Sequence, residues 1–379
     1  MSCDIKKMDI ISKLHQKIVV DRVRSIYQRS GPDSPIIVEL DPTAVCNLAC
    51  PGCISEDLIA MKNSFSSARL LEIGKEFQHM GVKGVILIGG GEPLSHPSIG
   101  KLISYFGQND ISVGITTNGT LINRYYKEIA TFSNWTRVSV DAASVEIFDA
   151  LRPAKNGKSM FKRVINNMKM LAGNKKGKLG FSFLIRDEVE GDDVVSNVHE
   201  IHDAALLAKD IGCDYFEVKP SYRYKNNIAH SLVKYPPNKI EEIKIQLEKL
   251  SALNSDDFKV IKAITLDDSL NGVKTKQVKK YTTCPVADMR TLVTAFGVFV
   301  CPYWRGKEQF NIGDPKTASF NDIWHSVKRK KVMSWLNPSI HCANLHCLRH
   351  ESNLEILKII EFIKDNQEID TVEEFDRFI

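Results

Sequence analysis

Three cysteines lie close together near the N-terminus, at Cys46, Cys50 and Cys53, in the run Cys-Asn-Leu-Ala-Cys-Pro-Gly-Cys. Three thiolates on a loop that follows a strand can converge on one metal centre. A structural zinc site uses four ligands, whereas a four-iron cluster held by three cysteines leaves one iron open for a substrate or cofactor. The triplet therefore predicts an iron–sulfur cluster with an open iron, and a partial zinc site is the alternative.

A glycine-rich loop follows the apolar run 84–88, with the sequence Gly89-Gly90-Gly91-Glu92-Pro93. Glycines let the backbone come close to a ligand, and Glu92 adds one carboxylate that can bind an ammonium group. The alternative is a tight turn without function. The position of this loop, some 40 residues past the cysteine triplet, favours a binding loop.

Polar side chains also end the next apolar runs. Asn118 stands in Thr-Thr-Asn-Gly-Thr after the run 111–115, and Ser139 and Asp141 end the run 137–140. Parallel α/β folds place their sites at such strand ends. The alternative is local, because Asn-Gly is a common turn pair and Ser144 suits a helix N-cap.

Lys219 and Tyr222 follow the run 215–218 and are predicted to face the same cavity as substrate contacts. For the lysine, an ordinary surface position is the alternative. Cys213, just before this run, is predicted to be a small buried residue. Return of a hydrogen atom to a substrate radical is the other role open to its thiol.

A second set of four cysteines lies in the C-terminal third, at Cys284, Cys301, Cys342 and Cys347. Four thiolates suffice for one fully ligated cluster that is closed to substrate and suited to electron transfer. A zinc site is the alternative, because three histidines accompany the last two cysteines, namely His341, His346 and His350.

Six short apolar runs alternate with helical patterns between residues 36 and 220. A helix with Leu70, Ile73, Phe77 and Met80 on one face is predicted between the first two runs, ending at Gly81. Strand and helix in alternation imply right-handed crossovers and a parallel sheet, open or partly closed into a barrel. The predicted strands are 36–40, 84–88, 111–115, 137–140, 180–184 and 215–218.

The remaining elements are predicted from shorter signals. A helix is expected over 236–253, a strand over 260–266, a hairpin that turns near Phe296-Gly297, and a helix over roughly 319–336. Two helices are expected at the C-terminus.

The composition is ordinary for a globular protein, with 43% hydrophobic and 26% charged residues and a net charge of +5. No basic stripe points to nucleic acid, and no run approaches the roughly 20 apolar residues that span a bilayer. The N-terminus lacks the apolar region of a secretory signal, so we expect a cytoplasmic protein that binds neither nucleic acid nor membrane. Its nine cysteines should then stay reduced, which favours metal ligation over disulfides.

The C-x3-C-x2-C spacing after the first strand resembles the signature of the radical S-adenosylmethionine (SAM) superfamily. That resemblance implies a [4Fe-4S] cluster whose open iron chelates the amino and carboxylate groups of SAM. Electron transfer from the cluster then releases a 5′-deoxyadenosyl radical that abstracts a substrate hydrogen. The family often has an aromatic residue before the third cysteine, where this sequence has Gly52.

The resemblance also implies the residues that contact SAM. Gly90, Gly91 and Glu92 are similar to the Gly-Gly-Glu motif that binds the SAM amino group. Family segments similar to 139–153 touch the ribose and carboxylate of SAM. The contacts implied on this basis are Asn118, Ser139, Asp141, Arg152 and Ser182.

The second cysteine set, with Cys301-Pro302 and Asn311-Ile-Gly-Asp-Pro before Trp324, resembles the auxiliary-cluster domains called SPASM and twitch. Four cysteines fit the single-cluster twitch version, which implies a second [4Fe-4S] cluster. The implied fold is a partial (β/α)6 radical SAM barrel with a smaller C-terminal α+β domain. The implied parts are a helical lead 1–35, the barrel 36–255, the auxiliary domain 256–350 and C-terminal helices 351–379.

The resemblance leaves the substrate class open between small molecules and ribosomal peptides or protein side chains. A lead of about 35 residues leaves no room for a leader-peptide-binding domain, since domains that fold alone rarely fall below about 40 residues. We therefore expect a small polar substrate, of the sugar or aminocyclitol type, that is oxidised, deoxygenated or epimerised. A peptide or protein is the alternative, and a zinc-binding interaction protein a more distant one. A radical SAM enzyme also needs an external electron donor, such as a flavodoxin or ferredoxin.

Overall fold

A parallel sheet forms the centre of the molecule in the computed structural model, which describes residues 10–31, 33–190, 193–225, 228–271 and 277–378. All six predicted strands are present, and they lie in the order β8-β5-β4-β3-β2-β1. The predicted parallel α/β class is therefore confirmed. The strands are β1 Ile37–Asp41, β2 Gly84–Leu87, β3 Ser112–Thr117, β4 Ser133–Ser139, β5 Lys178–Ile185 and β8 Tyr215–Pro220.

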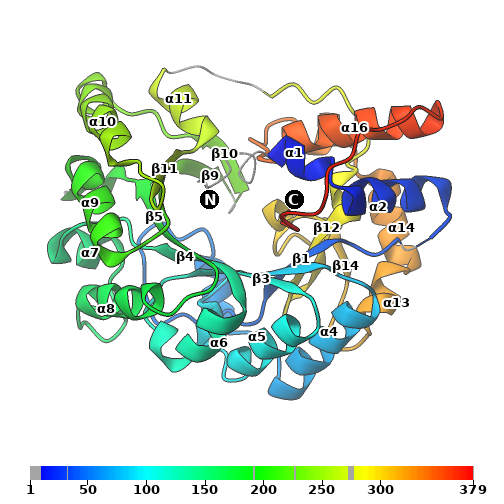
Figure 1. Cartoon of the computed structure of the whole chain (residues 1–379), viewed down its shortest axis with the longest axis horizontal. Coiled ribbons are helices and arrows are strands. Elements are labelled where there is room, and N and C mark those ends of the chain that lie inside the picture. Colours follow the sequence, from blue (N-terminus) through cyan, green and yellow to red (C-terminus); the bar gives the residue numbers. More distant parts are fainter. Residues whose placement is uncertain (1–9, 32, 191–192, 226–227, 272–276, 379) are drawn as a thin grey trace.

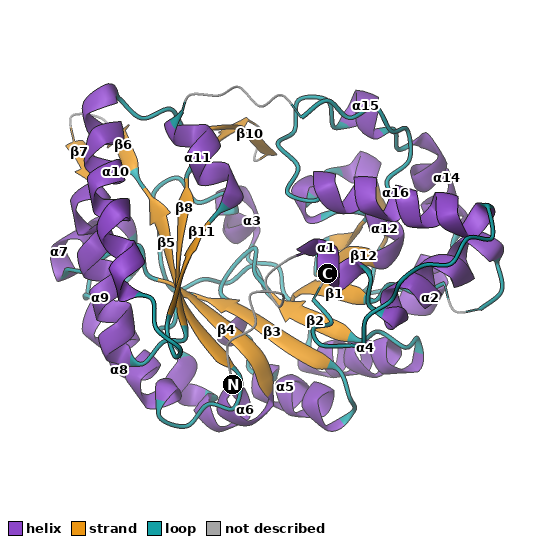
Figure 2. Ribbon diagram, turned by 45° about the horizontal axis from the view of Figure 1, so that its top comes forward, coloured by secondary structure: helices purple, strands orange, loops and turns teal. Residues whose placement is uncertain are grey.

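The sheet continues past both ends of this set (Figures 1 and 2). β11 Lys259–Lys262 pairs parallel to β8, and β12 Arg290–Thr294 pairs parallel to β1. The predicted hairpin is confirmed, because β12 turns into β13 Gly297–Phe299, and β14 Asn311–Gly313 follows. The predicted strand 260–266 is shorter than expected, since the chain enters α11 Ile264–Leu270 directly after β11.

Helices cover the outer side of the sheet, in a ring that Figure 1 shows from α4 round to α10. The predicted first helix is confirmed as α4, and its Leu70, Ile73 and Phe77 are buried. Ser66 caps it by accepting a hydrogen bond from the Arg69 backbone N–H at 3.2 Å. The covering helices are α4 Ser67–His79, α5 Ile99–Gln108, α6 Tyr126–Phe132, α7 Val145–Leu151, α8 Phe161–Ala172, α9 Ile201–Ile211 and α10 Pro237–Leu250.

Side chains alternate between the two faces of each strand, which separates a helix-facing core from a barrel interior. In β4, Thr136 and Val138 are buried under the helices, whereas Trp135, Arg137 and Ser139 face the other way and are partly exposed. The same alternation in β8 leaves every second side chain partly exposed. The interior face is therefore the one that can meet a ligand.

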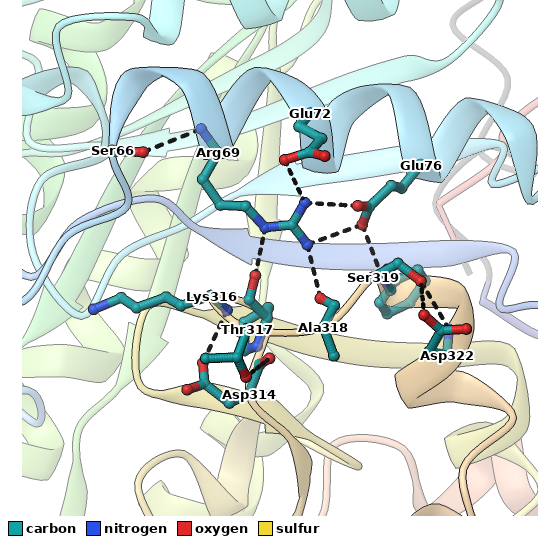
Figure 3. A network of polar contacts seen from close by, with 12 residues as sticks. Ser66, Arg69, Glu72, Glu76, Asp314, Lys316, Thr317, Ala318, Ser319 and Asp322 are labelled. Carbon is teal, nitrogen blue, oxygen red and sulfur yellow. Dashed lines mark hydrogen bonds and ion pairs between the residues drawn. The ribbon is translucent and has the colours of Figure 1, made fainter.

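The C-terminal part packs against α4 through a polar network (Figure 3). Arg69 donates to the backbone carbonyls of Pro315 at 2.6 Å and Ala318 at 2.9 Å. It also pairs with Glu76, which accepts a hydrogen bond from the Phe320 backbone N–H at 2.8 Å. This network fixes the start of α13, and with it the segment that leads to the last two cysteines.

The predicted helix 319–336 is divided into α13 Phe320–Trp324 and α14 Val327–Trp335. Ser326 ends the continuity because it accepts a hydrogen bond from the Arg329 backbone N–H at 3.0 Å and so caps a new helix. The other short elements are α3 Glu56–Met61, β6 Asp187–Glu190, β7 Asp193–Ser196, β9 Tyr222–Lys225, β10 Ile228–Leu232, α12 Val286–Met289 and α15 Pro338–His341.

The described N-terminal residues lie beside the C-terminal tail, where Gln16 and Val372 form a parallel bridge. The helical lead is confirmed for the described residues as α1 Ile10–Leu14 and α2 Lys17–Gln28. The prediction of two terminal helices is wrong, because α16 His350–Lys364 is followed by a described segment, 365–378, without helix. Buried Gln16 hydrogen-bonds the backbone of this tail, which replaces the hydrogen bonds that a helix would form. No helix among the described residues is long and apolar enough to cross a membrane.

Candidate functional site

The three N-terminal cysteines share one loop at the carboxyl end of β1. Cys46, Cys50 and Cys53 are each partly exposed, and α3 begins three residues after the last of them. Their placement at the carboxyl end of a parallel strand agrees with the sequence prediction.

Contacts with neighbouring loops hold this loop in place. The Ala49 backbone N–H donates to the carbonyl of Pro153 at 2.8 Å, which joins the loop to the segment after α7. Gly52 has a φ of +63°, a left-handed conformation that glycine adopts without steric cost. This backbone conformation therefore favours glycine over a residue with a side chain at position 52.

The three thiols influence one another electrostatically. Burial, with smaller contributions from Glu92, Cys50 and Cys53, raises the pKa of Cys46 to about 11. Burial also raises the pKa of Cys50, against the opposing effect of the Arg152 guanidinium. Iron cations would relieve this penalty, because metal binding stabilises thiolates. Three neighbouring thiols on one loop fit the ligand set of a four-iron cluster with an open iron. Within the described ranges, no three Cys, His, Asp or Glu side chains converge on the position of a single metal ion.

The glycine loop after β2 lies directly against the cysteine loop. The Gly90 backbone N–H donates to Asp41 Oδ2 at 2.5 Å. A Cβ atom at Gly91 would lie 2.5 Å from the carbonyl oxygen of Val45 and equally close to the backbone of Ala44. No side chain fits there, so glycine is required for the two loops to touch.

The Glu92 carboxylate is 2% exposed and joins the loops after β2 and β3. Its Oε1 accepts hydrogen bonds from the Thr117 hydroxyl at 2.6 Å and the Leu94 backbone N–H at 3.0 Å. Its Oε2 accepts one from the Asn118 backbone N–H at 2.7 Å. Burial raises its pKa in spite of these bonds. Oε2 keeps the capacity for one more donor, such as the ammonium group for which the residue was singled out.

Asn118 connects the loop after β3 to the cysteines. Its side-chain Nδ2 donates to Asn47 Oδ1 at 3.0 Å and lies 3.9 Å from Cys46 Sγ. Its Oδ1 accepts from the Thr120 hydroxyl at 2.6 Å. The Asn-Gly pair therefore forms the predicted turn and also contacts the first cysteine.

Asp141 and Arg152 form a buried ion pair beside the cysteine loop. Arg152 Nε donates to Asp141 Oδ2 at 3.0 Å, and Oδ1 accepts from the Leu184 backbone N–H at 2.8 Å. Asp141 has a φ of +60°, and Asn197 fixes this backbone by donating to its carbonyl at 2.9 Å. Burial lowers the pKa of Arg152, but Asp141 and Cys50 outweigh it and raise the pKa overall.

Ser139 and Ser182 are paired in register on neighbouring strands. Ser182 is 3% exposed, and its carbonyl accepts a hydrogen bond from the Val140 backbone N–H at 3.2 Å. Both serines lie on the interior face next to Asp141. The structure thus brings together all the residues predicted to contact SAM at one edge of the sheet.

Lys219 and Tyr222 are separated by the structure. Lys219 Nζ lies 3.1 Å from Glu217 Oε2 in the barrel interior. Tyr222 instead donates its hydroxyl to Thr265 Oγ1 at 3.3 Å, and its ring centroid lies 5.8 Å from that of His346. Only the lysine lies in the interior with the other predicted site residues.

Charged residues of the interior were missed from sequence. Arg137 Nη1 lies 3.2 Å from Glu217 Oε2, and Arg290 Nε donates to Glu39 Oε1 at 2.7 Å. Burial would raise the pKa of Glu217, but Lys219 and Arg137 outweigh it and lower the pKa. The signal was present, because a charged residue at every second position of an otherwise apolar strand marks a polar interior face.

The four C-terminal cysteines come from four different segments. Cys284 precedes α12, Cys301 follows β13, Cys342 follows α15 and Cys347 lies before α16. Burial, with smaller contributions from Cys347 and Cys342, raises the pKa of Cys284 to about 12. Burial raises the pKa of Cys301 as well, to which Cys347, Cys284 and Cys342 add. The structure therefore gathers all four thiols in one neighbourhood.

Two of the three nearby histidines are engaged elsewhere. His341 Nδ1 accepts from the Asn337 backbone N–H at 2.9 Å, and His350 Nδ1 lies 3.0 Å from the Tyr281 hydroxyl. His346 Nε2 is buried without a hydrogen-bond partner. Cys213 is 3% exposed in the main core, the buried position predicted for it.

Comparisons with known proteins agree with this geometry. Residues 40–195 match the family described as the radical SAM superfamily. The chain is 32% identical over 126 residues to the mycofactocin maturase MftC of Mycobacterium ulcerans (strain Agy99), covering 33% of this chain and 34% of that protein. It therefore spans about a third of the length of this relative.

Two further relatives match over most of the chain. The antilisterial bacteriocin subtilosin biosynthesis protein AlbA of Bacillus subtilis (strain 168) is 22% identical over 353 residues, which is 89% of this chain and 72% of AlbA. The structure of Streptococcus suis SuiB bound to the precursor peptide SuiA superposes with a TM-score of 0.59. It is 15% identical and covers 94% of this chain and 79% of SuiB, so it supports the fold.

These matches contradict the prediction that a small polar molecule is a more probable partner than a peptide. SuiB carries a precursor peptide, and AlbA serves the biosynthesis of a bacteriocin. The prediction depended on the short N-terminal lead, whose length does not determine how a substrate is recognised.

The thiol triplet, the loops around it and the sequence match lead to one assignment. Residues 40–195 of this chain form a domain of the radical SAM superfamily.

Proposed function

We propose that this chain is a radical SAM enzyme that modifies a peptide or protein side chain. One observation carries the proposal. The loop with Cys46, Cys50 and Cys53 lies against the glycine loop at Gly90 and Gly91, at the carboxyl edge of a parallel sheet. An open iron bound there would lie beside backbone and side-chain groups that can hold an amino acid.

The residues proposed for the cofactors are those that the structure gathers at this edge. The three thiols would hold the [4Fe-4S] cluster, and Asn118 would hold Cys46 in position through its amide. The proposed SAM contacts are Gly90, Gly91, Glu92, Asn118, Ser139, Asp141, Arg152 and Ser182. When bound, the cluster and SAM supply a 5′-deoxyadenosyl radical that removes a hydrogen atom from the substrate.

The chain also closes the opposite end of the barrel, where water would otherwise enter. Phe378 in the C-terminal tail is 9% exposed, and its ring centroid lies 5.4 Å from that of Trp135 in an edge-on contact. Arg377 anchors the tail to Asp110 through a 3.0 Å ion pair. Exclusion of water matters because a radical in the interior must meet only its substrate.

We propose further that Cys284, Cys301, Cys342 and Cys347 bind a second [4Fe-4S] cluster, in an auxiliary region of SPASM or twitch type over 256–350. The support is that thiols from four segments lie close enough to raise one another's pKa, and a bound cation would stabilise their thiolates. With four cysteines and no open iron, this site would accept or relay an electron from the substrate.

A peptide or protein substrate is proposed from the relatives. Two of them are named for maturation or biosynthesis of such products, and SuiB is seen with a precursor peptide.

Anaerobic reconstitution with iron and sulfide, followed by SAM and dithionite, tests the proposal. We expect about eight iron atoms per chain and formation of 5′-deoxyadenosine. Cys50→Ala should abolish 5′-deoxyadenosine, whereas Cys213→Ala, which removes a buried thiol outside both sets, should not. Zinc without sulfide, or cleavage that survives Cys50→Ala, would overturn the proposal.

A further inference from the structure

Two cations in the barrel interior share a single carboxylate oxygen. Arg137 Nη1 and Lys219 Nζ lie 3.2 Å and 3.1 Å from the same Glu217 Oε2. The exposed fraction is 30% for the Arg137 side chain, 26% for Lys219 and 19% for Glu217, so all three are accessible to solvent. Arg137 Nε is buried and makes no hydrogen bond. One carboxylate cannot balance two cations, which leaves positive charge and an unused donor at this position.

The sheet is built so that these side chains meet. Arg137 and Glu217 lie on β4 and β8, with β5 between them, and Gly180 is the residue of β5 that pairs with Arg137. A Cβ at Gly180 would lie 2.0 Å from the ring of Tyr215, so glycine is required there. The Tyr215 ring therefore lies over β5 at Gly180, between the strands that carry Arg137 and Glu217.

The neighbouring interior carboxylates each form an ion pair of their own. Glu39 is paired with Arg290, and Asp141 with Arg152. Glu39 also lies near Arg349 and Arg305. Cations therefore outnumber acids among these groups, and Arg137 and Lys219 are the two that share one carboxylate oxygen.

This cation pair lies directly below the proposed SAM contacts. Arg137 is the interior-facing position before Ser139 on β4, and Glu217 is paired in register with Ser182. Lys219 is paired with Leu184, whose backbone N–H donates to Asp141. A group held by the two cations would place the atoms next to it at the edge where hydrogen abstraction is proposed.

We propose that Arg137 and Lys219 bind a carboxylate of the peptide or protein substrate and so select an acidic residue next to the reacting position. The inference rests on the proposed function. The partly exposed Arg137 guanidinium and the adjacent Lys219 ammonium offer charged donors that a carboxylate accepts. In the free enzyme, Glu217 holds the two cations close together and weakens their attraction for another anion.

Binding of small probes to the reconstituted full chain tests this inference without turnover. The probes are N-acetylglutamate α-amide, its neutral isostere N-acetylglutamine α-amide, and N-acetylalanine, which carries only a terminal carboxylate. Saturation-transfer NMR should detect the glutamate probe and not the glutamine probe. A stronger signal from N-acetylalanine would assign the site to a peptide C-terminus. Equal signals from the glutamate and glutamine probes would overturn the inference.

Three variants separate an anion site from a structural ion pair. Lys219→Met should weaken binding of the glutamate probe by about tenfold, as expected for loss of a charged contact. Glu217→Gln should strengthen it by roughly threefold or more, because the competing carboxylate is gone. If Glu217 formed only a structural ion pair, Glu217→Gln would not strengthen binding of the glutamate probe. Lys178→Met removes a cation at the amino end of β5 that is paired with Asp214. It is the matched control and should leave binding of the glutamate probe unchanged.

Two further results distinguish the inference from the proposed function. The Lys178→Met control and the wild-type chain should both form 5′-deoxyadenosine from SAM without substrate, whereas failure of the proposed function would abolish this product in both. The glutamate probe should also bind with SAM present. Its displacement by SAM would assign the two cations to the SAM carboxylate and overturn the inference.

Discussion

The two cysteine sites of this chain are assembled in opposite ways. The first takes its three thiols from eight consecutive residues on one loop, and polar groups from three neighbouring strand ends support it. The second takes four thiols from segments between Cys284 and Cys347, which the fold must bring together. Backbone N–H groups and polar side chains of neighbouring loops surround the first site. Under the proposed function, the three-thiol site is the open one that meets ligands, and the four-thiol site is the closed one that carries electrons.

Asp41 links the two sites. Its Oδ2 accepts from Gly90 of the first site and lies 3.6 Å from Nε of Arg305, four residues after Cys301. Its Oδ1 is buried without a hydrogen-bond partner. Contacts of this kind make the relative position of the two sites depend on a few buried polar groups.

Removing one thiol from each site should have the largest effect and should differ between them. Cys50→Ala should abolish SAM cleavage, a loss of more than about 100-fold, because the cluster with the open iron is no longer held. Cys301→Ala should leave cleavage without substrate intact and remove about half of the iron, since only one of two clusters is lost. Iron and sulfide content, read beside 5′-deoxyadenosine, check both outcomes. Loss of cleavage in Cys301→Ala would show that the sites do not function separately.

Breaking the Asp141–Arg152 pair should affect the first site alone. Asp141→Asn leaves the Arg152 guanidinium buried without its counter-charge, which costs about 3 kcal/mol or more. We expect the KM for SAM to rise by roughly tenfold to a hundredfold with little loss of iron. The amide still accepts from the Leu184 backbone N–H, so the loop should keep its shape. An unchanged KM would place this pair outside the SAM site.

The link at Asp41 should appear in the pH dependence of stability. Burial raises the pKa of Asp41 to about 6, against the effects of Arg305 and Gly90. With a raised pKa, the folded state binds the proton more tightly than the unfolded state. The contribution to stability is therefore complete below about pH 4 and is lost as the pH rises through about 6.

Asp41→Asn should remove this dependence. The wild-type free energy of unfolding should gain up to about 3 kcal/mol between pH 6 and pH 4 relative to the variant. Denaturant titrations of both proteins at several pH values measure the difference. Parallel curves for the two proteins would show that Asp41 is ionised throughout.

The comparison also shows what a sequence can predict. The six parallel strands and the first thiol triplet were predictable because each is a local pattern of apolar runs, glycines and cysteine spacing. The Arg137–Glu217–Lys219 cluster was missed because it joins β4 and β8 across the intervening β5, and only the register of the sheet reveals it. The second terminal helix was predicted wrongly because contacts with Gln16 hold the tail extended. The role of each site residue in binding SAM stays a prediction.

Replacement of Lys279 should have the smallest effect of these changes, and only on the second cysteine site. The residue is 5% exposed, and its Nζ donates to the carbonyl of Leu345 at 2.7 Å, between Cys342 and Cys347. Burial lowers the pKa of Lys279, although the two thiols oppose this. In return, its ammonium favours both thiolates.

Lys279→Met should weaken thiolate ligation at the second site without touching the first. We expect a chelator to remove half of the iron about two to five times faster than from the wild-type chain, while 5′-deoxyadenosine formation without substrate is unchanged. Lys279→Arg keeps the charge and should behave like the wild type. Faster loss of all the iron, or of cleavage, would mean that Lys279 supports both sites, and the division between an open and a closed site would then no longer hold.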